Sequence, residues 1–245
     1  MSAAPTATGT RMPETSLPIR VLCTLGLQGV LTEVGPSLAR RGLYVVPTFG
    51  ATNLMLPKIA LGEAADVAIL TDDAITHLVQ LGTIQSHSRR DLALSAIGIA
   101  VASGAAKPYI RTVETFKQTL MVARSIGFSR SGASGLHFAD VIEQLGIAEE
   151  VRRKSKVIDG VIGEMVARHE VELGIQQVSE LKLVEGIDIV GPLPDELQKV
   201  TTFTAGVFAN SARPAAAGVL IAALASPEVA AVMRRQGLEP TVAVG

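Results

Sequence analysis

Small hydroxyl residues stand at the ends of several apolar stretches, where they could bind an anion. Thr24 follows IRVLC, Thr52 follows VVPTFGA, and the loop Ser129–Gly135 (SRSGASG) follows SIGF. A helix that begins at such a point presents unpaired backbone N–H groups and the positive end of its dipole. Hydroxyls and N–H groups together can hold an anion without a cationic side chain. The pattern therefore predicts an anion site, with a set of capped helices that bind nothing as the alternative.

The candidate ligand contacts share a position at a strand end or in the turn that follows it. They are Thr24, Gly26, Thr52, Asn53, Ser129, Ser131, Ser134 and Gln177. Glycine in such a turn lets the backbone approach a ligand closely. Of the adjacent Gln176 and Gln177, one is expected to face the ligand and the other the far side of the sheet, because strand side chains alternate.

Three ionisable side chains near these turns could act as a general base. Glu164 lies in the first helical turn after GVIG, His137 lies one turn into the helix after SGASG, and Lys58 comes about one and a half turns after Thr52. Each also has a plain structural role: a carboxylate that suits the helix dipole, a packed histidine, or a lysine that faces solvent. The sequence does not choose among them.

Several function classes lack their sequence signals. HExxH, CxxC, P-loop, GxGxxG and GxSxG patterns are absent and the four histidines are scattered, so we predict no metal and no cofactor. Cys23, the one cysteine, lies in an apolar stretch and is expected to be a buried small side chain. A net charge of −1 without blocks of like charge argues against a nucleic-acid partner. No apolar run reaches the roughly 18 residues of a membrane span, so membrane insertion is not expected.

The elements that must position these residues alternate between strand and helix. Three strand–turn–helix units in residues 19–81 predict an open parallel sheet, and such sheets bind ligands beyond the carboxyl ends of their strands. That edge would carry Thr24, Thr52 and Asp72. A second series of strands and helices fills residues 112–190.

Two long apolar runs, at 92–103 and 200–209, are expected to cross between two lobes. The prediction is an α/β fold with two lobes, each an open, mostly parallel sheet flanked by helices, joined by two hinge strands. The predicted ranges are a disordered lead-in at 1–17, a first lobe at 18–95 plus 205–245, and a second lobe at 96–204, with the ligand cleft between the lobes.

The first residues also predict a location. They are polar and rich in proline and lack the apolar core of a secretory signal, which predicts a cytoplasmic chain as written. A processed mature chain with a new Met would look the same and would be periplasmic.

Seven segments of the sequence carry a resemblance to a known group. They are Val21–Gly26, Phe49–Thr52, GEAADVAIL at 62–70, SGASG at 131–135, VARHEVELGIQQVSE at 166–180, IDIVGPLP at 187–194 and SPEVAAVMRRQGLEP at 226–240. With these segments the chain resembles the type II periplasmic binding proteins, in particular the molybdate-binding substrate-binding proteins of ABC transporters. The resemblance covers nearly all of residues 18–240.

The resemblance implies a small oxyanion held by hydroxyls and backbone N–H groups. By motif, the contacts would fall on Thr24, Thr52, Ser134, Val161 and Gln177, and an ABC permease would be the partner if the chain is exported. Two positions depart from the pattern. Thr24-Leu25-Gly26 stands where the family usually has small Ala or Ser residues, and Gln177 stands where molybdate binders tend to carry tyrosine. The ligand is therefore expected to be a small anion whose identity stays open.

Two functions remain in view. In the first, the cleft binds an oxyanion or a small di- or tricarboxylate and closes over it. In the second, the chain is a cofactor-free isomerase, because some members of this broad group resemble aconitate isomerase, which acts on a polycarboxylate. Glu164, His137 or Lys58 would then be the base. A ligand sensor ranks last, because the sequence adds no helix-turn-helix segment.

Overall fold

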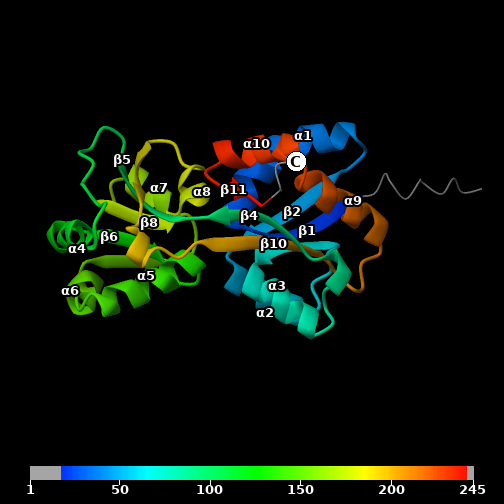
Figure 1. Cartoon of the computed structure of the whole chain (residues 1–245), viewed down its shortest axis with the longest axis horizontal. Helices are drawn as coiled ribbons and strands as arrows, with labels where there is room; N and C mark the ends of the chain where they lie inside the picture. The colour runs from blue at the N-terminus through cyan, green and yellow to red at the C-terminus, as the bar shows by residue number, and fades with distance from the viewer. Residues whose placement is uncertain (1–17, 242–245) are drawn as a thin grey trace, which may run out of the picture.

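The computed structural model describes residues 18–241, which form two α/β lobes side by side along the long axis of the molecule (Figure 1). Each lobe contains one β-sheet with helices packed on it. The predicted two-lobed α/β class is confirmed. The predicted disordered lead-in at 1–17 lies outside the described residues.

The first lobe is built on a six-stranded sheet of order β11-β4-β10-β3-β1-β2. Its strands are β1 (Ile19–Thr24), β2 (Val45–Gly50), β3 (Val67–Thr71), β4 (Arg90–Ser95), β10 (Thr201–Val207) and β11 (Glu239–Pro240). Strands β2, β1 and β3 run parallel to one another, whereas β10, β4 and β11 add antiparallel pairs. The parallel part carries the carboxyl ends that border the cleft.

Helices cover both faces of the first sheet. They are η2 (Leu25–Leu27), α1 (Gln28–Arg40), α2 (Thr52–Ala60), α3 (Asp72–Gln80), η3 (Ser86–Ser88), α9 (Pro214–Leu224) and α10 (Pro227–Arg235). Helices α1, α9 and α10 share one apolar core, and α2 and α3 share another. The strands serve both cores because their side chains alternate: in β1, Val21 and Cys23 join the first core and Leu22 joins the second.

The second lobe is built on a five-stranded sheet of order β7-β6-β8-β5-β9. Its strands are β5 (Ile97–Ala102), β6 (Ile126–Ser129), β7 (Ser155–Ile158), β8 (Leu173–Gln177) and β9 (Ile187–Pro192). Its helices are α4 (Val113–Val122), α5 (Ala133–Gln144), α6 (Ala148–Arg153), α7 (Ile162–Ala167), α8 (Val178–Leu181) and η4 (Asp195–Leu197). Here too parallel pairs (β7, β6 and β8) meet antiparallel ones (β5 and β9).

Both sheets combine parallel and antiparallel strand pairs. The chain enters and leaves the second lobe through segments that pair antiparallel with their neighbours, and local sequence pattern does not encode that direction. The apolar run 92–103 is two strands, β4 in the first sheet and β5 in the second, and Ala96 lies between them. The run 200–209 contains β10, which pairs in the first sheet from Thr201 onward. The lobe limits at 95/96 and 204/205 stay predictions.

The loop between β6 and α5 is tighter than predicted. Helix α5 begins at Ala133, three residues before the expected start at Leu136, and its N-cap is Gly132 without a side-chain cap bond. A Cβ atom on Gly135 would lie 1.8 Å from the backbone oxygen of Ser129. Only glycine therefore allows the first turn of α5 to pack this closely on the end of β6.

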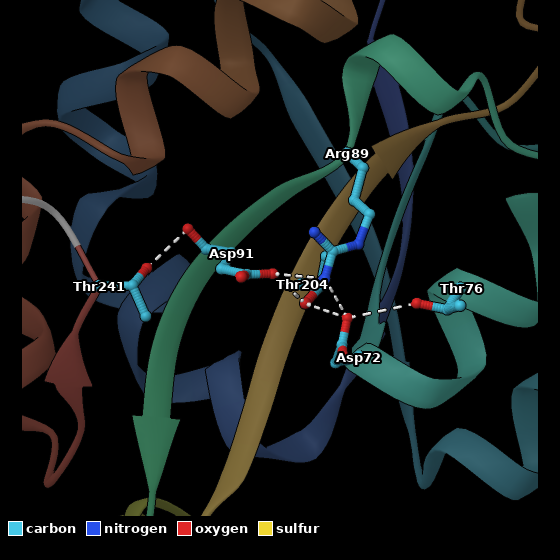
Figure 2. Close-up of polar contacts among 6 residues, drawn as sticks. All are labelled: Asp72, Thr76, Arg89, Asp91, Thr204 and Thr241. Carbon is cyan, nitrogen blue, oxygen red and sulfur yellow. Dashed lines mark hydrogen bonds and ion pairs between the residues drawn. The ribbon is translucent and has the colours of Figure 1, made fainter.

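A polar cluster links the start of α3 to β4 and β10 (Figure 2). The Arg89 guanidinium contacts the carboxylates of Asp72 and Asp91, the second at 3.2 Å. Thr204, which is fully buried, donates to Asp91 Oδ1 at 2.8 Å. Asp72 therefore turns toward Arg89, which lies between η3 and β4, and it does not line the space between the lobes.

Two further predictions concern burial and membranes. Cys23 is fully buried in β1, and burial raises the pKa of its thiol, as expected of a packed side chain. Within residues 18–241, no single helix has the length and apolar character needed to cross a membrane, and α9 with α10 meets that test only as a pair bent by 61°.

Candidate functional site

One enclosed space lies between the lobes at the carboxyl ends of the parallel strands. Its lining comes from both lobes: Thr24, Leu25, Ala51, Thr52, Thr71 and Phe203 from the first, and Ser129, Gly132, Ala133, Gly160, Gln176, Gln177 and Glu180 from the second. Its volume is about 20 Å³, room for about one water molecule. A larger ligand therefore needs the lobes to part before it can enter.

Four predicted residues meet in this lining: Thr24, Thr52, Ser129 and Gln177. All four are buried. Ser129 Oγ accepts a hydrogen bond from Gly132 N at 2.8 Å, and Thr52 Oγ1 accepts one from Thr71 N at 3.4 Å. Each hydroxyl proton is thus left to donate elsewhere, for example to an anion. Their role as ligand contacts stays a prediction.

Gln177 has a polar atom without a partner. Its Nε2 donates to Thr201 Oγ1 at 2.9 Å, and its Oε1 is buried without a hydrogen-bond partner among the described residues. If the amide is rotated, Thr201 donates to Oε1 and Nε2 becomes the free group, because the two amide orientations differ only in the assignment of O and N. In either orientation, one buried polar atom of Gln177 lacks a hydrogen-bond partner among the described residues. Leaving it unpaired costs free energy, and a ligand that bonds to it would remove that cost.

Gln176 positions the neighbouring loop. Its Oε1 accepts from Ile162 N at 2.7 Å and its Nε2 donates to Gly160 O at 2.9 Å. The expectation that one glutamine faces the ligand and the other the far side of the sheet was too simple, because both border the cleft. The amide oxygen and the amide nitrogen of Gln176 both bond to the β7–α7 loop. Gln177, by contrast, keeps one polar side-chain atom without a hydrogen-bond partner in the described part of the chain.

The other predicted contacts flank the enclosed space without lining it. Gly26 is buried beneath Phe203, whose ring a Cβ atom would meet at 2.5 Å. Asn53 Nδ2 donates to Ser131 O at 3.1 Å, which joins the first lobe to the second. Ser131 Oγ also donates to Asp159 Oδ1 at 2.6 Å. Ser134 is buried in the first turn of α5, and Val161 is the half-buried N-cap of α7.

The three candidate bases lie away from the lining. Glu164 is exposed on α7 and pairs with Arg168 at 3.3 Å. The Nε2 of His137 donates to Leu197 O at 2.8 Å, and Lys58 is exposed on α2. None of the three borders the enclosed space between the lobes, so the structure does not favour any of them as the base.

Glu180 is the ionisable residue that the sequence analysis missed. It lies in the first turn of α8, three residues after Gln177, and is 9% exposed. Burial raises its pKa to about 7, and a hydrogen bond from Gln176 opposes that shift. The signal was present in the spacing, since three residues after a cleft-facing strand end is one helical turn onward.

The electrostatics of the lining are unusual for an anion site. No Lys, Arg or His occurs in it, so the donors are hydroxyls, the Gln177 amide and the starts of α2 and α5. Among residues 18–241, His, Cys, Asp and Glu side chains form no group of three or more that could hold a metal ion. The geometry fits a small anion bound by neutral donors.

A larger groove on the second lobe lacks these features. It measures about 620 Å³ and is bordered by Lys107, Arg124, His169 and Glu172 among others. The Arg124 side chain is 88% exposed and pairs with Glu172 at 3.1 Å. Open surface with a solvated ion pair does not make a built binding site.

The fold and the cleft define a class: two-lobed proteins that bind a small solute between their lobes. Residues 19–239 match the family model described as bacterial extracellular solute-binding protein. The chain belongs to this family.

One relative in sequence and two solved structures are similar to this chain over most of its length. An aconitate isomerase from Pseudomonas sp is 36% identical over 233 residues, 92% of this chain and 88% of that protein. The periplasmic molybdate-binding protein of Azotobacter vinelandii superimposes with a TM-score of 0.76 at 18% identity, covering 90% of this chain and 98% of that one. A sulfate-binding protein of Mycobacterium tuberculosis gives a TM-score of 0.70 at 15% identity, covering 91% and 87%.

Proposed function

We propose that the protein binds a small polycarboxylate in the interlobe cleft and interconverts its double-bond isomers without a cofactor. The observation that carries the proposal is the convergence of neutral donors from both lobes on one enclosed space without a cationic side chain. Such donors suit carboxylate oxygens and can stabilise the charge that develops when a proton leaves carbon. The aconitate isomerase relative, at 36% identity over most of both chains, supports the isomerase chemistry.

The reaction would be an allylic proton shift. A base removes a proton from the methylene carbon of an unsaturated tricarboxylate, and the C–H electron pair forms a new double bond to the central carbon. The electrons of the former double bond then take up a proton at the opposite carbon. Atoms and electrons balance within the substrate, so neither oxidant nor reductant is needed.

The test has a binding arm and a chemical arm. Thermal unfolding is followed with molybdate, sulfate, phosphate, citrate, and cis- and trans-aconitate; a ligand at a hundred times its Kd stabilises the fold by about 2.7 kcal/mol. We expect the polycarboxylates to stabilise the protein. NMR in deuterated water should then show cis and trans isomers of aconitate interconverting with deuterium incorporation. Stabilisation by oxyanions alone, with no interconversion, would contradict the proposal.

A transport role is the second candidate, favoured by membership of a family of extracellular solute-binding proteins. In that role the protein would be exported, would deliver a small anion to an ABC permease and would release it unchanged. Cell fractionation separates the two functions: a periplasmic protein together with loss of solute uptake in a deletion strain favours transport. A cytosolic protein that interconverts isomers favours catalysis.

A further inference from the structure

Glu180 is the one acid–base group in the described lining of the cleft. The remaining lining residues are apolar, hydroxyl, amide or glycine, none of which gains or loses a proton near neutral pH. Glu180 reaches the cleft from α8 of the second lobe, and Thr24 and Thr52 border the same space from the first lobe. A ligand held between the lobes would therefore lie against this carboxyl group.

No charged side chain of the surrounding elements enters the lining. Helix α8 packs against η2, α1, β5, β8, β9 and α7. The charged residues on these elements, and the one just after α8, are Glu33, Arg40, Glu164, Asp188 and Lys182. Three of them have partners elsewhere: Glu33 with Arg235, Glu164 with Arg168, and Asp188 with the backbone N of Gly104. Arg40 and Lys182 are exposed. Glu180 is thus buried without a counter-charge.

We propose that Glu180 is the catalytic residue: its carboxylate removes a proton from one substrate carbon, and its carboxyl, after exchange of that proton with solvent, protonates the opposite carbon. This inference rests on the proposed isomerase function. In the first step the ionised carboxylate of Glu180 takes the methylene proton, and in the second the resulting carboxyl protonates the far carbon. Glu180 ends the cycle ionised, as it began, and no other reactant is consumed.

The environment of Glu180 suits this task. Its raised pKa, about 7, leaves both protonation states populated near neutral pH, which is the condition for efficient general base catalysis. A bound anionic substrate adds like charge beside the carboxylate and strengthens it as a base. The starts of α2 and α5 border the same space and can stabilise the charge that moves onto the substrate carboxylates.

The test compares Glu180→Gln with the wild-type protein and with Glu185→Gln, the same change at an exposed position five residues along the chain. With aconitate as substrate, Glu180→Gln should lower kcat for isomerisation and for deuterium exchange at least about 100-fold. It should still bind trans-aconitate by calorimetry, because the neutral donors remain. Glu185→Gln should match the wild type in all three measurements.

A second variant covers the case in which Glu180→Gln does not fold. Glu180→Asp keeps a carboxyl but draws it back by one methylene, so it should retain reduced activity with a shifted dependence of kcat/KM on pH. Substrate ionisation is common to both proteins, so a shift between their profiles reports residue 180.

The outcomes separate the two proposals. If the wild-type protein isomerises aconitate and Glu180→Gln does so at the same rate, the assignment of Glu180 is wrong but the proposed function stands. An unchanged rate and pH profile in Glu180→Asp would lead to the same conclusion. A wild-type protein without isomerisation would overturn the proposed function and the assignment with it.

Discussion

A single carboxyl group, that of Glu180, has the strongest consequences at the scale of the residue. It borders a space of about 20 Å³ that residues of both lobes line, so its surroundings include residues far away in the sequence. Burial favours the neutral form of a carboxyl group, and a neutral carboxyl is compatible with an arriving anion. The protonation state of Glu180 is therefore linked to the stability of the fold as well as to the chemistry of the cleft.

The pH dependence of unfolding should report this link. The pKa of Glu180 is raised from an ordinary value of 4.5 to about 7 in the folded protein. Between those values the folded state holds a proton that the unfolded state has lost, so the free energy of unfolding falls as pH rises from about 4.5 to about 7 and then levels off. The loss is on the order of 3 kcal/mol.

Urea unfolding at pH 5, 6, 7 and 8 measures this change. In Glu180→Gln, the fall in the free energy of unfolding between about pH 4.5 and about pH 7 that Glu180 causes should be absent. The variant should therefore be more stable than the wild type at pH 8. Parallel pH profiles for the two proteins would contradict the predicted burial of an ionisable Glu180.

The sequence predicts the cleft residues at the strand ends, but it does not predict which neighbouring residues surround them. Thr24, Thr52, Ser129 and Gln177 were predicted because the carboxyl ends of parallel strands meet at one edge, and the structure brings them together. The spacing places Glu180 one helical turn after Gln177, but the packing of α8 against η2, more than 150 residues earlier in the chain, is not readable from the local sequence. His137 and Glu164 looked suitable by spacing alone, yet the former bonds to Leu197 and the latter pairs with Arg168.

At the scale of the element, the junction of β6 with α5 sets the geometry of the cleft. The helix starts at Ala133, and its first turn lies on the carbonyl of Ser129 because Gly135 has no side chain. The strand–loop–helix order was readable from the sequence. The early start of the helix was not, since it depends on this close contact and not on a cap residue.

Gly135→Ala should therefore displace α5 from the end of β6. The new methyl would overlap the Ser129 carbonyl, and overpacking of this kind costs about 1–3 kcal/mol of unfolding free energy. Anion affinity should fall as well, because Gly132 and Ala133 border the cleft.

Gly218→Ala is the matched control. Gly218 lies inside α9, where an added Cβ would meet nothing within 4 Å, so this change should stabilise the protein by about 0.5–1 kcal/mol. Chemical unfolding and calorimetry of both variants check the prediction. Equal stabilities for the two would show that the close packing of α5 on β6 is absent in solution.

At the scale of the whole molecule, the two lobes are joined by the crossing strands and by contacts across the cleft. The direct bond from Asn53 Nδ2 to Ser131 O, at 3.1 Å, spans the lobes beside the cleft. The sequence predicted two lobes and two crossing segments. It did not predict how far the lobes are closed, because closure is decided by small contacts between distant residues.

Removing the lobe-spanning bond should favour the open form. A single hydrogen bond contributes about 0.5–1.5 kcal/mol, so Asn53→Ala should weaken anion binding by up to about tenfold, mainly through faster dissociation. Asn210→Ala, at an exposed turn of the first lobe, is the control. Stopped-flow dissociation of the stabilising anion measures both, and identical rates would argue against a role for Asn53 in closure.

The burial of Cys23 has a practical consequence for studying that motion. The only thiol of the chain is sealed inside the first lobe, and its raised pKa keeps it unreactive toward labelling reagents. In the folded protein, labelling reagents should therefore react with introduced cysteines and not with Cys23. A pair of spectroscopic probes, one on each lobe, can be attached without mutating the core, and the distance between them then reports opening directly. Any labelling of Cys23 itself would reveal unfolding of the first lobe.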